Sequence, residues 1–516
     1  MRDDGLTRRT GRLANRLTGK PAKNCLYTHE VSDTKHAEMM NYEPVIGLEV
    51  HVQLKTATKA FCGCANIFGS RENTHVCPVC LGLPGSLPVL NETALKSAVK
   101  VALALGCDVK HFTKFDRKNY YYPDLPKNFQ ISQYDMPFSE NGKMDIRAQD
   151  GVKRIRVKRV HLEEDAGKLI HPESGTESLV DYNRAGTPLL EIVSEPDLHT
   201  PEEAYVYLTD LKLILQYLDV SDCDMEKGSL RCDANISLRP AGTSGLGVKA
   251  ELKNMNSFRA VRQALEYEIK RQAAVLEEGG SVVQETRLWN EKKQLTLPMR
   301  SKEEAHDYRY FPEPDLPPFV ISAEEIDTIK KELPEMPAQR RRRFMEAFGL
   351  CEKDASTVVA SKSFADFFEA CLELYDQPKK IVHWLIGPVS FQMNTRGQDM
   401  AELRLTPAAL TELIDLVETG KISQLAGKDV LQEMLESGKS AGKIVVEENL
   451  AQVSDAGALL AVIQEVLAAN KKSVDDYKAG KENALMFLVG QVMRLSRGKA
   501  NPKTARELLV EKLRSL

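Results

Sequence analysis

Three short segments of this 516-residue sequence alternate between apolar and polar side chains. In residues 45–54 the polar positions are Glu49, His51 and Gln53, and the positions between them are apolar from Ile46 to Leu54. Residues 231–239 repeat the alternation with Asp233 on the polar side, and residues 248–253 place Lys249, Glu251 and Lys253 on one face. A period of two is that of a strand with one buried face. The pattern predicts an antiparallel sheet whose second face is either plainly solvated or carries a polar site.

Helix signals separate these strands and dominate the second half of the chain. Residues 201–218 begin behind Thr200 with Pro201 at the first helical position, and residues 256–280 end in a glycine pair suited to a C-cap. After Pro334 the pattern becomes helices joined by short polar turns, with a second break at Thr406. We expect a sheet domain over residues 40–334, a helical linker domain over 335–405 and a helical tail domain over 406–516.

The first 39 residues are rich in arginine and show no apolar periodicity. We expect a disordered extension or a start codon placed too early, because Met40 begins a normal-looking N-terminus; a basic arm and a transit peptide are the alternatives. Elsewhere no apolar run approaches the ~18 residues of a membrane span. Lys plus Arg (70) nearly balance Asp plus Glu (74), so any RNA contact must come from local patches.

Four of the ten cysteines fall within residues 61–85, as a C-x-C followed by a C-x-x-C. They are Cys62, Cys64, Cys77 and Cys80. Free or redox-active thiols are the alternative, but no βαβ pattern surrounds them. Four thiolates in one short span can close around a tetrahedral Zn²⁺ and leave no open position, which predicts a structural zinc loop. The other cysteines follow no framework spacing, which is typical of a reducing, cytoplasmic compartment.

Acidic residues cluster in residues 159–171, where His161, Glu163, Glu164 and Asp165 stand close together. Carboxylates this close together repel one another, which destabilises the fold unless they are solvated or bind a cation. The strand phase slips between Lys158 and Arg159, which predicts a bulge. Together with the carboxylates of the alternating strands, this group would suit a Mg²⁺ ion that bridges nucleotide phosphates.

A tyrosine-rich stretch, residues 114–135, carries Lys118 and Lys127 around three tyrosines and two prolines. It is either an ordinary loop or a rigid turn that grips phosphates or stacks on an RNA end.

Several long motifs occur in fixed order from about Met40 to the C-terminus: "VIGLEVHVQLKT", "FDRKNYYYPDLPKNFQISQYD", "HLEEDAGK", "DYNRAGTPLLEIVSEPD", "GSLRCDANISLRP", "ELKNMNSFRAVRQALEYEIKRQ" and "DYRYFPEPDLPP". In these motifs the chain resembles the B subunit of the tRNA-dependent amidotransferase. The resemblance implies an α+β protein with an antiparallel-sheet cradle domain, a helical linker domain and an all-α tail domain similar to the YqeY family. It also implies a heterotrimer with an amidase-type A subunit and a small C subunit, and neither a membrane nor DNA as partner.

The activity that the resemblance implies is an ATP-dependent carbon–nitrogen ligase reaction with glutamine as the amido donor. Glu or Asp misacylated onto tRNA(Gln) or tRNA(Asn) is phosphorylated and then amidated with ammonia from the A subunit. Two rival interpretations remain. One is a zinc-braced tRNA-binding module without a catalytic site, and the other is a stand-alone kinase or ligase for another carboxylate.

The resemblance also assigns residues. It implies that the Mg²⁺ and ATP site is formed by Glu49, His51, Glu164, Asp233 and Glu251. Strand phase alone nominates Glu163, and we follow the resemblance in preferring Glu164. Lys118, Tyr120 and Lys127 are expected to contact phosphate, substrate or the ammonia path. In the tail domain the expected tRNA contacts are Arg494, Arg497, Lys499, Lys503 and Arg506.

Overall fold

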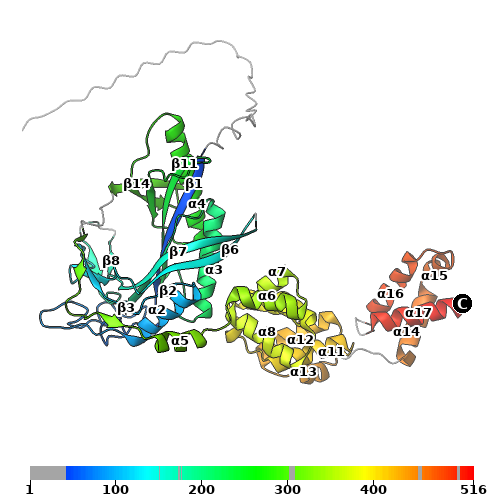
Figure 1. The fold of residues 1–516 in the computed structure, drawn as a ribbon. Helices are drawn as coiled ribbons and strands as arrows, with labels where there is room; N and C mark the ends of the chain where they lie inside the picture. The colour runs from blue at the N-terminus through cyan, green and yellow to red at the C-terminus, as the bar shows by residue number, and fades with distance from the viewer. Residues whose placement is uncertain are drawn as a thin grey trace, which may run out of the picture.

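The computed structural model describes residues 42–149, 151–172, 175, 177–301, 308–450, 456–496 and 500–515. Figure 1 shows a sheet domain followed by two groups of helices. The expected N-terminal extension, residues 1–39, lies outside the described residues.

A nine-stranded sheet forms the first domain, in the order β14-β13-β12-β11-β1-β10-β7-β6-β2. Neighbouring strands are antiparallel except for β12 and β13, which run parallel. The bounds are β1 Tyr42–Gln53, β2 Asp108–Val109, β6 Ser139–Ala148, β7 Gly151–Glu164, β10 Pro188–Ser194, β11 Leu230–Pro240, β12 Ala250–Lys253, β13 Glu285–Asn290 and β14 Leu295–Ser301. The antiparallel-rich sheet and the helices that follow it confirm the α+β expectation at this level.

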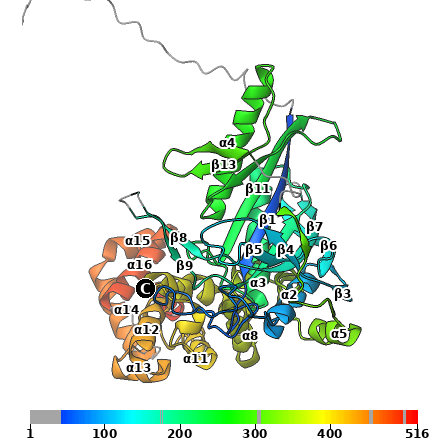
Figure 2. The same cartoon turned by 90° about the vertical axis from the view of Figure 1, so that its left-hand side faces the viewer.

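The apolar face of the sheet packs against three helices, α2 (Glu92–Ala104), α3 (Pro201–Tyr217) and α4 (Phe258–Glu277). Figure 2 shows α4 beside β11 and β13, with α2 and α3 near the other end of the sheet. Ile46, Leu48, Val50 and Val52 are fully buried in this core, as the alternation predicted. Thr200 forms the capping box of α3 with Glu203. The polar positions of the strands are therefore left on the opposite face.

Three smaller sheets surround one end of the large one. β15 (Phe311–Pro312), β4 (Asp116–Asn119) and β5 (Phe129–Ser132) form one, while β3 (Phe112–Thr113) pairs with β16 (Phe319–Val320) and β8 (Lys168–Ile170) pairs with β9 (Leu179–Asp181). The bulge predicted in β7 is confirmed. Val193 of β10 lies opposite Arg159 and Ser194 lies opposite Val157, which leaves Lys158 as the extra residue.

The helical region contains two hydrophobic clusters beyond that of the sheet domain. The first holds residues 344–445 together with Tyr217, and the second holds residues 459–513. After α5 (Ala323–Lys331) the elements are α6 Pro337–Phe348, α7 Glu352–Val359, α8 Lys362–Leu374, α9 Pro378–Trp384, η3 Leu385–Val389, α10 Ser390–Arg396, η4 Met400–Glu402, α11 Pro407–Glu418, α12 Gln424–Ser437, α13 Ala441–Glu447, α14 Ala456–Ala469, α15 Lys471–Lys478, α16 Asn483–Leu495 and α17 Pro502–Ser515.

The division expected between residues 405 and 406 falls inside the first of these two clusters, because α11 packs against α8. Thr406, on which that expectation was based, does mark the start of a helix. The side chain of Thr406 caps α11 by accepting a hydrogen bond from the backbone of Ala409. A helix start, however, does not show where a hydrophobic core ends. The described helices group as α6–α13 and α14–α17.

Candidate functional site

The register of the strands places the predicted polar residues in rows across one face of the sheet. His51 on β1 lies opposite Glu191 on β10, and Glu191 lies opposite His161 on β7. Two residues away along β1, Glu49 lies opposite Asp233 on β11. These side chains share the face opposite the buried apolar positions because alternate residues of a strand point the same way.

The tightest group on this face consists of His51, Glu163 and Glu191, whose ligand atoms all lie within 4.8 Å of one another. His51 Nε2 is 3.3 Å from Glu191 Oε2 and 3.8 Å from Glu163 Oε1. His161 Nε2 is 3.5 Å from Glu163 Oε2 and 3.7 Å from Glu191 Oε2. All four side chains are largely shielded, with exposed fractions between 2% and 19%. We call His51, Glu163 and Glu191 the acid–histidine group.

Electrostatics in this group favour charged forms in spite of burial. Burial disfavours a charged His51, yet the carboxylates of Glu191, Glu163 and Asp233 outweigh it and raise the pKa of His51 to about 9. Burial also opposes ionisation of Glu163 and Glu191, but the neighbouring histidines hold the pKa of each carboxyl below its usual range. The protein thus keeps two carboxylates ionised in a shielded place, with a cationic imidazolium between them.

The β4–β5 hairpin brings Lys118 and Tyr120 to this group. Burial opposes the charge of Lys118, and the carboxylates of Glu163 and Glu191 overcome it and raise the pKa of Lys118. The Lys118 ammonium lies 4.8 Å from the ring centre of Tyr308 and 5.5 Å from that of Tyr120. Ser132 on β5 donates a hydrogen bond of 3.0 Å to Glu163. The hairpin therefore places the Lys118 ammonium, flanked by two tyrosine rings, next to the carboxylates.

A second group lies on the neighbouring rows, towards β12. Lys253 Nζ is 2.6 Å from Asp233 Oδ2 and 3.6 Å from Glu251 Oε1. Thr286 donates to Glu251 at 2.9 Å, and Asn235 donates to Glu49 at 2.9 Å. Three predicted carboxylates are thus held on the same face but already have protein partners.

Glu164 stands apart from both groups. Its carboxylate pairs with the ammonium of Lys127 and accepts the backbone N–H of Ile131 at 2.9 Å. Both side chains of the pair are buried, with 4% and 9% exposed. Because successive residues of a strand point to opposite faces, only one of Glu163 and Glu164 can share a face with His161, and it is Glu163. The residue near His51 is therefore Glu163, which the strand phase nominated, and not Glu164, which we preferred.

The four cysteines of the loop converge. Their sulfur atoms all lie within 4.8 Å of one another, and Cys77 Sγ and Cys80 Sγ are 3.9 Å apart. A tetrahedral Zn²⁺ with Zn–S bonds of about 2.3 Å separates its sulfurs by about 3.8 Å. The backbone N–H of Cys77 also donates to Cys80 Sγ at 3.1 Å. The four sulfurs are therefore close enough together to hold one metal ion.

Two family models match the chain. The "GatB/GatE catalytic domain" matches residues 44–327, and the "GatB domain" matches residues 366–513. The chain belongs to the GatB family. It is 57% identical over 474 residues to the B subunit of the aspartyl/glutamyl-tRNA(Asn/Gln) amidotransferase of Thermoanaerobacter sp. (strain X514), a match that covers 92% of this chain and 100% of the relative. Relatives with the same name from Carboxydothermus hydrogenoformans and Brevibacillus brevis are 54% and 52% identical, each over 93% of this chain and 100% of the relative.

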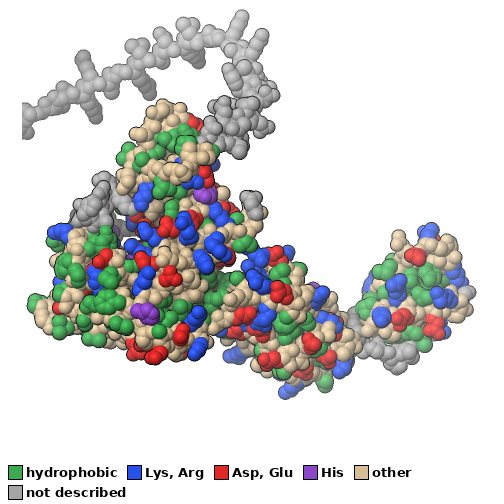
Figure 3. Space-filling view, in the orientation of Figure 1, with side chains coloured by type: hydrophobic (Ala, Val, Ile, Leu, Met, Phe, Trp, Pro, Cys, Tyr) green, Lys and Arg blue, Asp and Glu red, His purple; other side chains and the backbone are tan. Residues whose placement is uncertain are grey.

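The region matched by the GatB domain begins within α8 and ends within α17, and it carries the basic residues expected to contact tRNA. Arg494 lies near the end of α16, and Lys503 and Arg506 lie on α17. Arg497 and Lys499 lie outside the described residues. Lys503 and Arg506 line a groove of about 490 Å³ together with Glu507, Glu511 and others. On the face shown in Figure 3, Lys and Arg side chains of this group are mixed with acidic and apolar ones.

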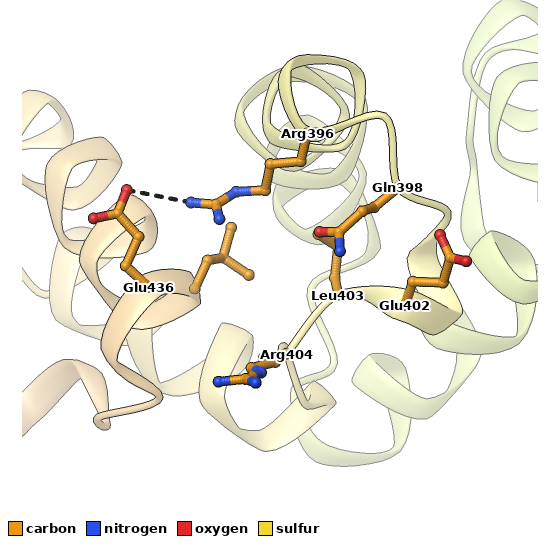
Figure 4. A pocket seen from close by; sticks show the side chains of 7 residues that line it. Arg396, Gln398, Glu402, Leu403, Arg404 and Glu436 are labelled. Carbon is orange, nitrogen blue, oxygen red and sulfur yellow. Dashed lines mark hydrogen bonds and ion pairs between the residues drawn. The ribbon is translucent and has the colours of Figure 1, made fainter.

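A polar cavity of about 400 Å³ lies in the first helical group, between α10, η4 and α12. Figure 4 shows Arg396 reaching towards Glu436 at its side, with Gln398, Glu402 and Arg404 around the opening. The Arg396 Nη2 to Glu436 Oε1 distance is 3.3 Å. The cavity brings together none of the residues that the sequence nominated.

Sequence reasoning missed two residues near the site of this GatB chain, Glu191 and Tyr308, and Glu191 is the more important. It is the single acidic residue in the apolar strand "PLLEIVS", but Leu189 and Val193 share its face of the strand, so no clean alternation of apolar and polar residues marks it. Tyr308 was missed because it comes close to Lys118 only through the pairing of β15 with β4. In the part of the chain that the structure describes, no helix is both long and apolar enough to cross a membrane.

Proposed function

We propose that this chain is the B subunit of an aspartyl/glutamyl-tRNA(Asn/Gln) amidotransferase and carries the site where the amino-acid carboxylate is activated and amidated. Its substrates would be ATP and Glu or Asp misacylated onto tRNA(Gln) or tRNA(Asn). An amidase-type A subunit would supply ammonia from glutamine, and a small C subunit would complete a cytoplasmic heterotrimer. The acid–histidine group beside Lys118 is the observation that carries this proposal.

The chemistry explains why ATP is needed. A carboxylate is a poor electrophile, and its oxygen cannot leave when ammonia attacks. Transfer of the γ-phosphoryl group forms a new P–O bond to the carboxylate and releases ADP. Ammonia then forms the C–N bond while the C–O bond breaks and inorganic phosphate leaves. Phosphoryl transfer depends mainly on positioning and charge neutralisation, which side chains on a rigid sheet can supply.

Glu163 and Glu191 fit a magnesium ion, because Mg²⁺ in nucleotide sites is usually held by one or two carboxylates and keeps water and phosphate oxygens as its other ligands. Bound there, Mg²⁺ would neutralise phosphate charge during the transfer. We propose Glu163 in the place for which the resemblance nominated Glu164. His51 lies between these carboxylates and could serve Mg²⁺ only as a neutral imidazole, so metal binding there would release its proton. Glu49, Asp233 and Glu251 are proposed to contribute from the adjoining rows.

Lys118 is proposed to bind the phosphate that is transferred. Its ammonium lies on the side of the group formed by Tyr120 and Tyr308, where the rings restrict its movement and limit access by water. Lys127 and Glu164 form a buried pair next to this hairpin and are proposed to position it, because Gln130 of β5 donates a 2.7 Å hydrogen bond to the backbone oxygen of Glu164.

The cysteine loop is proposed to hold a structural Zn²⁺ that takes no part in the reaction, since four thiolates fill its coordination shell. The basic residues of α16 and α17, with Arg497 and Lys499, are proposed to contact the tRNA body. The extension of residues 1–39 has no role in the proposal.

Amidation with ammonium chloride in place of glutamine tests this function. The chain, purified with its partner subunits, receives Mg²⁺, ATP and Glu-tRNA(Gln), and the aminoacyl group is analysed. We expect Gln-tRNA only when ATP is present, and its loss in Asp233→Asn with assembly retained. Asp145→Asn is the matched control, because Asp145 on β6 forms an exposed pair with Arg154 on β7. Failure with both Glu-tRNA(Gln) and Asp-tRNA(Asn) would leave the tRNA-binding module as the better interpretation.

A further inference from the structure

Lys59 is a fully buried lysine with no part in the proposed reaction. It lies just before the first cysteine pair, in a small hairpin where Thr58 bridges Ala65 and the backbone N–H of Lys59 donates to Cys64 O at 3.0 Å. A lysine is almost never fully buried unless its ammonium has partners. The contacts of this side chain therefore bear on what it does.

The Lys59 ammonium has three acceptors. Its Nζ donates to the backbone oxygen of His75 at 2.7 Å, to the backbone oxygen of Tyr182 at 3.3 Å and to Cys80 Sγ at 3.7 Å. Three acceptors match the three N–H donors of a charged ammonium, whereas a neutral amine has only two. The nearby Lys127 touches the same loop with its methylene groups at Gly82, but its ammonium pairs with Glu164.

The charge of the cysteine cluster explains why an ammonium would be placed beside it. Four thiolates around one divalent cation leave two negative charges uncompensated, and the Cys80 sulfur is buried. Hydrogen bonds and nearby cations around a metal site tune its affinity, and their loss typically weakens binding. We propose that Lys59 offsets negative charge of the four-cysteine metal cluster. Its ammonium also links the cluster to the turn formed by residues 182–187, through its hydrogen bonds to Cys80 and Tyr182.

The second part of the proposal rests on the packing of that turn. Gly186 adopts a φ of +86°, and a Cβ placed there would lie 3.5 Å from Cys80 Cβ, 3.5 Å from Lys59 Cδ and 3.8 Å from Glu164 Oε2. The backbone N–H of Ala60 donates to Gly186 O at 2.8 Å, and Gly186 N–H donates to Asp165 O at 2.9 Å. Lys59 therefore joins the cluster to the segment that contacts the Lys127–Glu164 pair.

The inference rests on the zinc ion proposed above, and metal affinity tests it without any activity measurement. Lys59→Met keeps most of the length of the side chain and removes the ammonium. Lys55→Met is the matched control, because Lys55 is exposed and pairs with Asp219 on the surface. Zinc is titrated out of each full-length protein with a chromophoric chelator, and far-UV circular dichroism is recorded alongside.

We expect zinc affinity to fall by about 10-fold to 100-fold in Lys59→Met and to stay unchanged in Lys55→Met. Equal affinities in folded Lys59→Met and wild-type protein would overturn the proposal while leaving zinc in place. Wild-type protein that binds no zinc would overturn the metal site itself and the compensation with it, so the two failures are distinguishable.

A measurement on the wild-type chain covers the case in which Lys59→Met does not fold. Acetylation of lysines with an amine-reactive reagent is followed by mass spectrometry before and after zinc is removed. We expect Lys59 to be protected in the zinc-loaded protein and to be modified at least several-fold more after chelation, with Lys55 equally reactive in both states. Equal modification of Lys59 in both states would overturn the link between the lysine and the cluster.

Discussion

Glu163 and Glu164 are adjacent in the chain, and our account gives them opposite roles that single substitutions can separate. Glu163→Gln removes one of two carboxylates from the acid–histidine group, in which its ligand oxygen lies within 4.8 Å of those of His51 and Glu191. Glu164→Gln instead removes the partner of Lys127 in a pair of which less than a tenth is exposed. The two variants change volume and polarity equally, so each serves as the control for the other.

The expected magnitudes follow from these contacts. Removing one member of a buried ion pair leaves the other charge uncompensated and costs about 3–5 kcal/mol. For a domain of this size that corresponds to a drop in Tm on the order of 10 °C in Glu164→Gln. In Glu163→Gln the repulsion by Glu191 disappears and Ser132 retains an acceptor, so the loss of stability is smaller. Its main loss is in turnover, about 10²–10³-fold for a group that stabilises transferring charge.

The assay combines thermal unfolding of each variant with ATP-dependent amidation driven by ammonium chloride over a Mg²⁺ titration. We expect Glu163→Gln to keep most of its Tm, to lose turnover and to need more Mg²⁺. Glu164→Gln should have a lower Tm and, below that temperature, a nearly wild-type Mg²⁺ dependence. Wild-type turnover in Glu163→Gln, together with a lost Mg²⁺ response in a stable Glu164→Gln, would refute the reasoning from strand phase and restore Glu164 as the ligand.

Three further predictions concern other parts of the chain. Cys80→Ser should reduce the zinc content, measured by atomic absorption, from about one ion per chain to near zero, because only three of the four thiolate ligands remain. Full zinc retention would contradict the proposal that the cysteine loop holds zinc. Tyr217→Phe should cost about 1 kcal/mol in thermal unfolding, because its buried hydroxyl donates to Val359 O at 2.9 Å, and no change would show that this bond contributes nothing. Truncation after Leu450 removes the second helical cluster, residues 459–513, and leaves the first complete, so tRNA affinity and its salt dependence should fall while the sheet domain stays folded. Unchanged binding in salt titrations would contradict a role of α14–α17 in tRNA contact.

Local patterns predicted much of the sheet domain. Alternation in β1 and β11 named their buried residues, the phase slip located the bulge at Lys158, and Thr200 marked the start of α3. These features depend only on neighbours in the sequence. The extent of the first helical cluster depends on which helices pack together, and a capping signal at Thr406 carries no such information.

The candidate site was predictable in part for the same reason. His51 was found from its own strand, and Glu163 was nominated by phase before the resemblance redirected the choice to its neighbour. The contacts of Tyr308 and Lys59 depend on loops that meet from distant parts of the chain: Lys59 reaches a carbonyl 123 residues away, a relation that no local pattern contains.

The central claim is that the acid–histidine group activates the carboxylate with ATP. The most direct measurement is ADP formation by the assembled complex with Glu-tRNA(Gln) and Mg²⁺ but no ammonia donor, comparing wild type with Glu191→Gln. Our account predicts ADP release that depends on the aminoacylated tRNA in the wild type and falls at least about 100-fold in the variant. Equal ADP release by a properly assembled Glu191→Gln complex would contradict the claim and place phosphoryl transfer elsewhere.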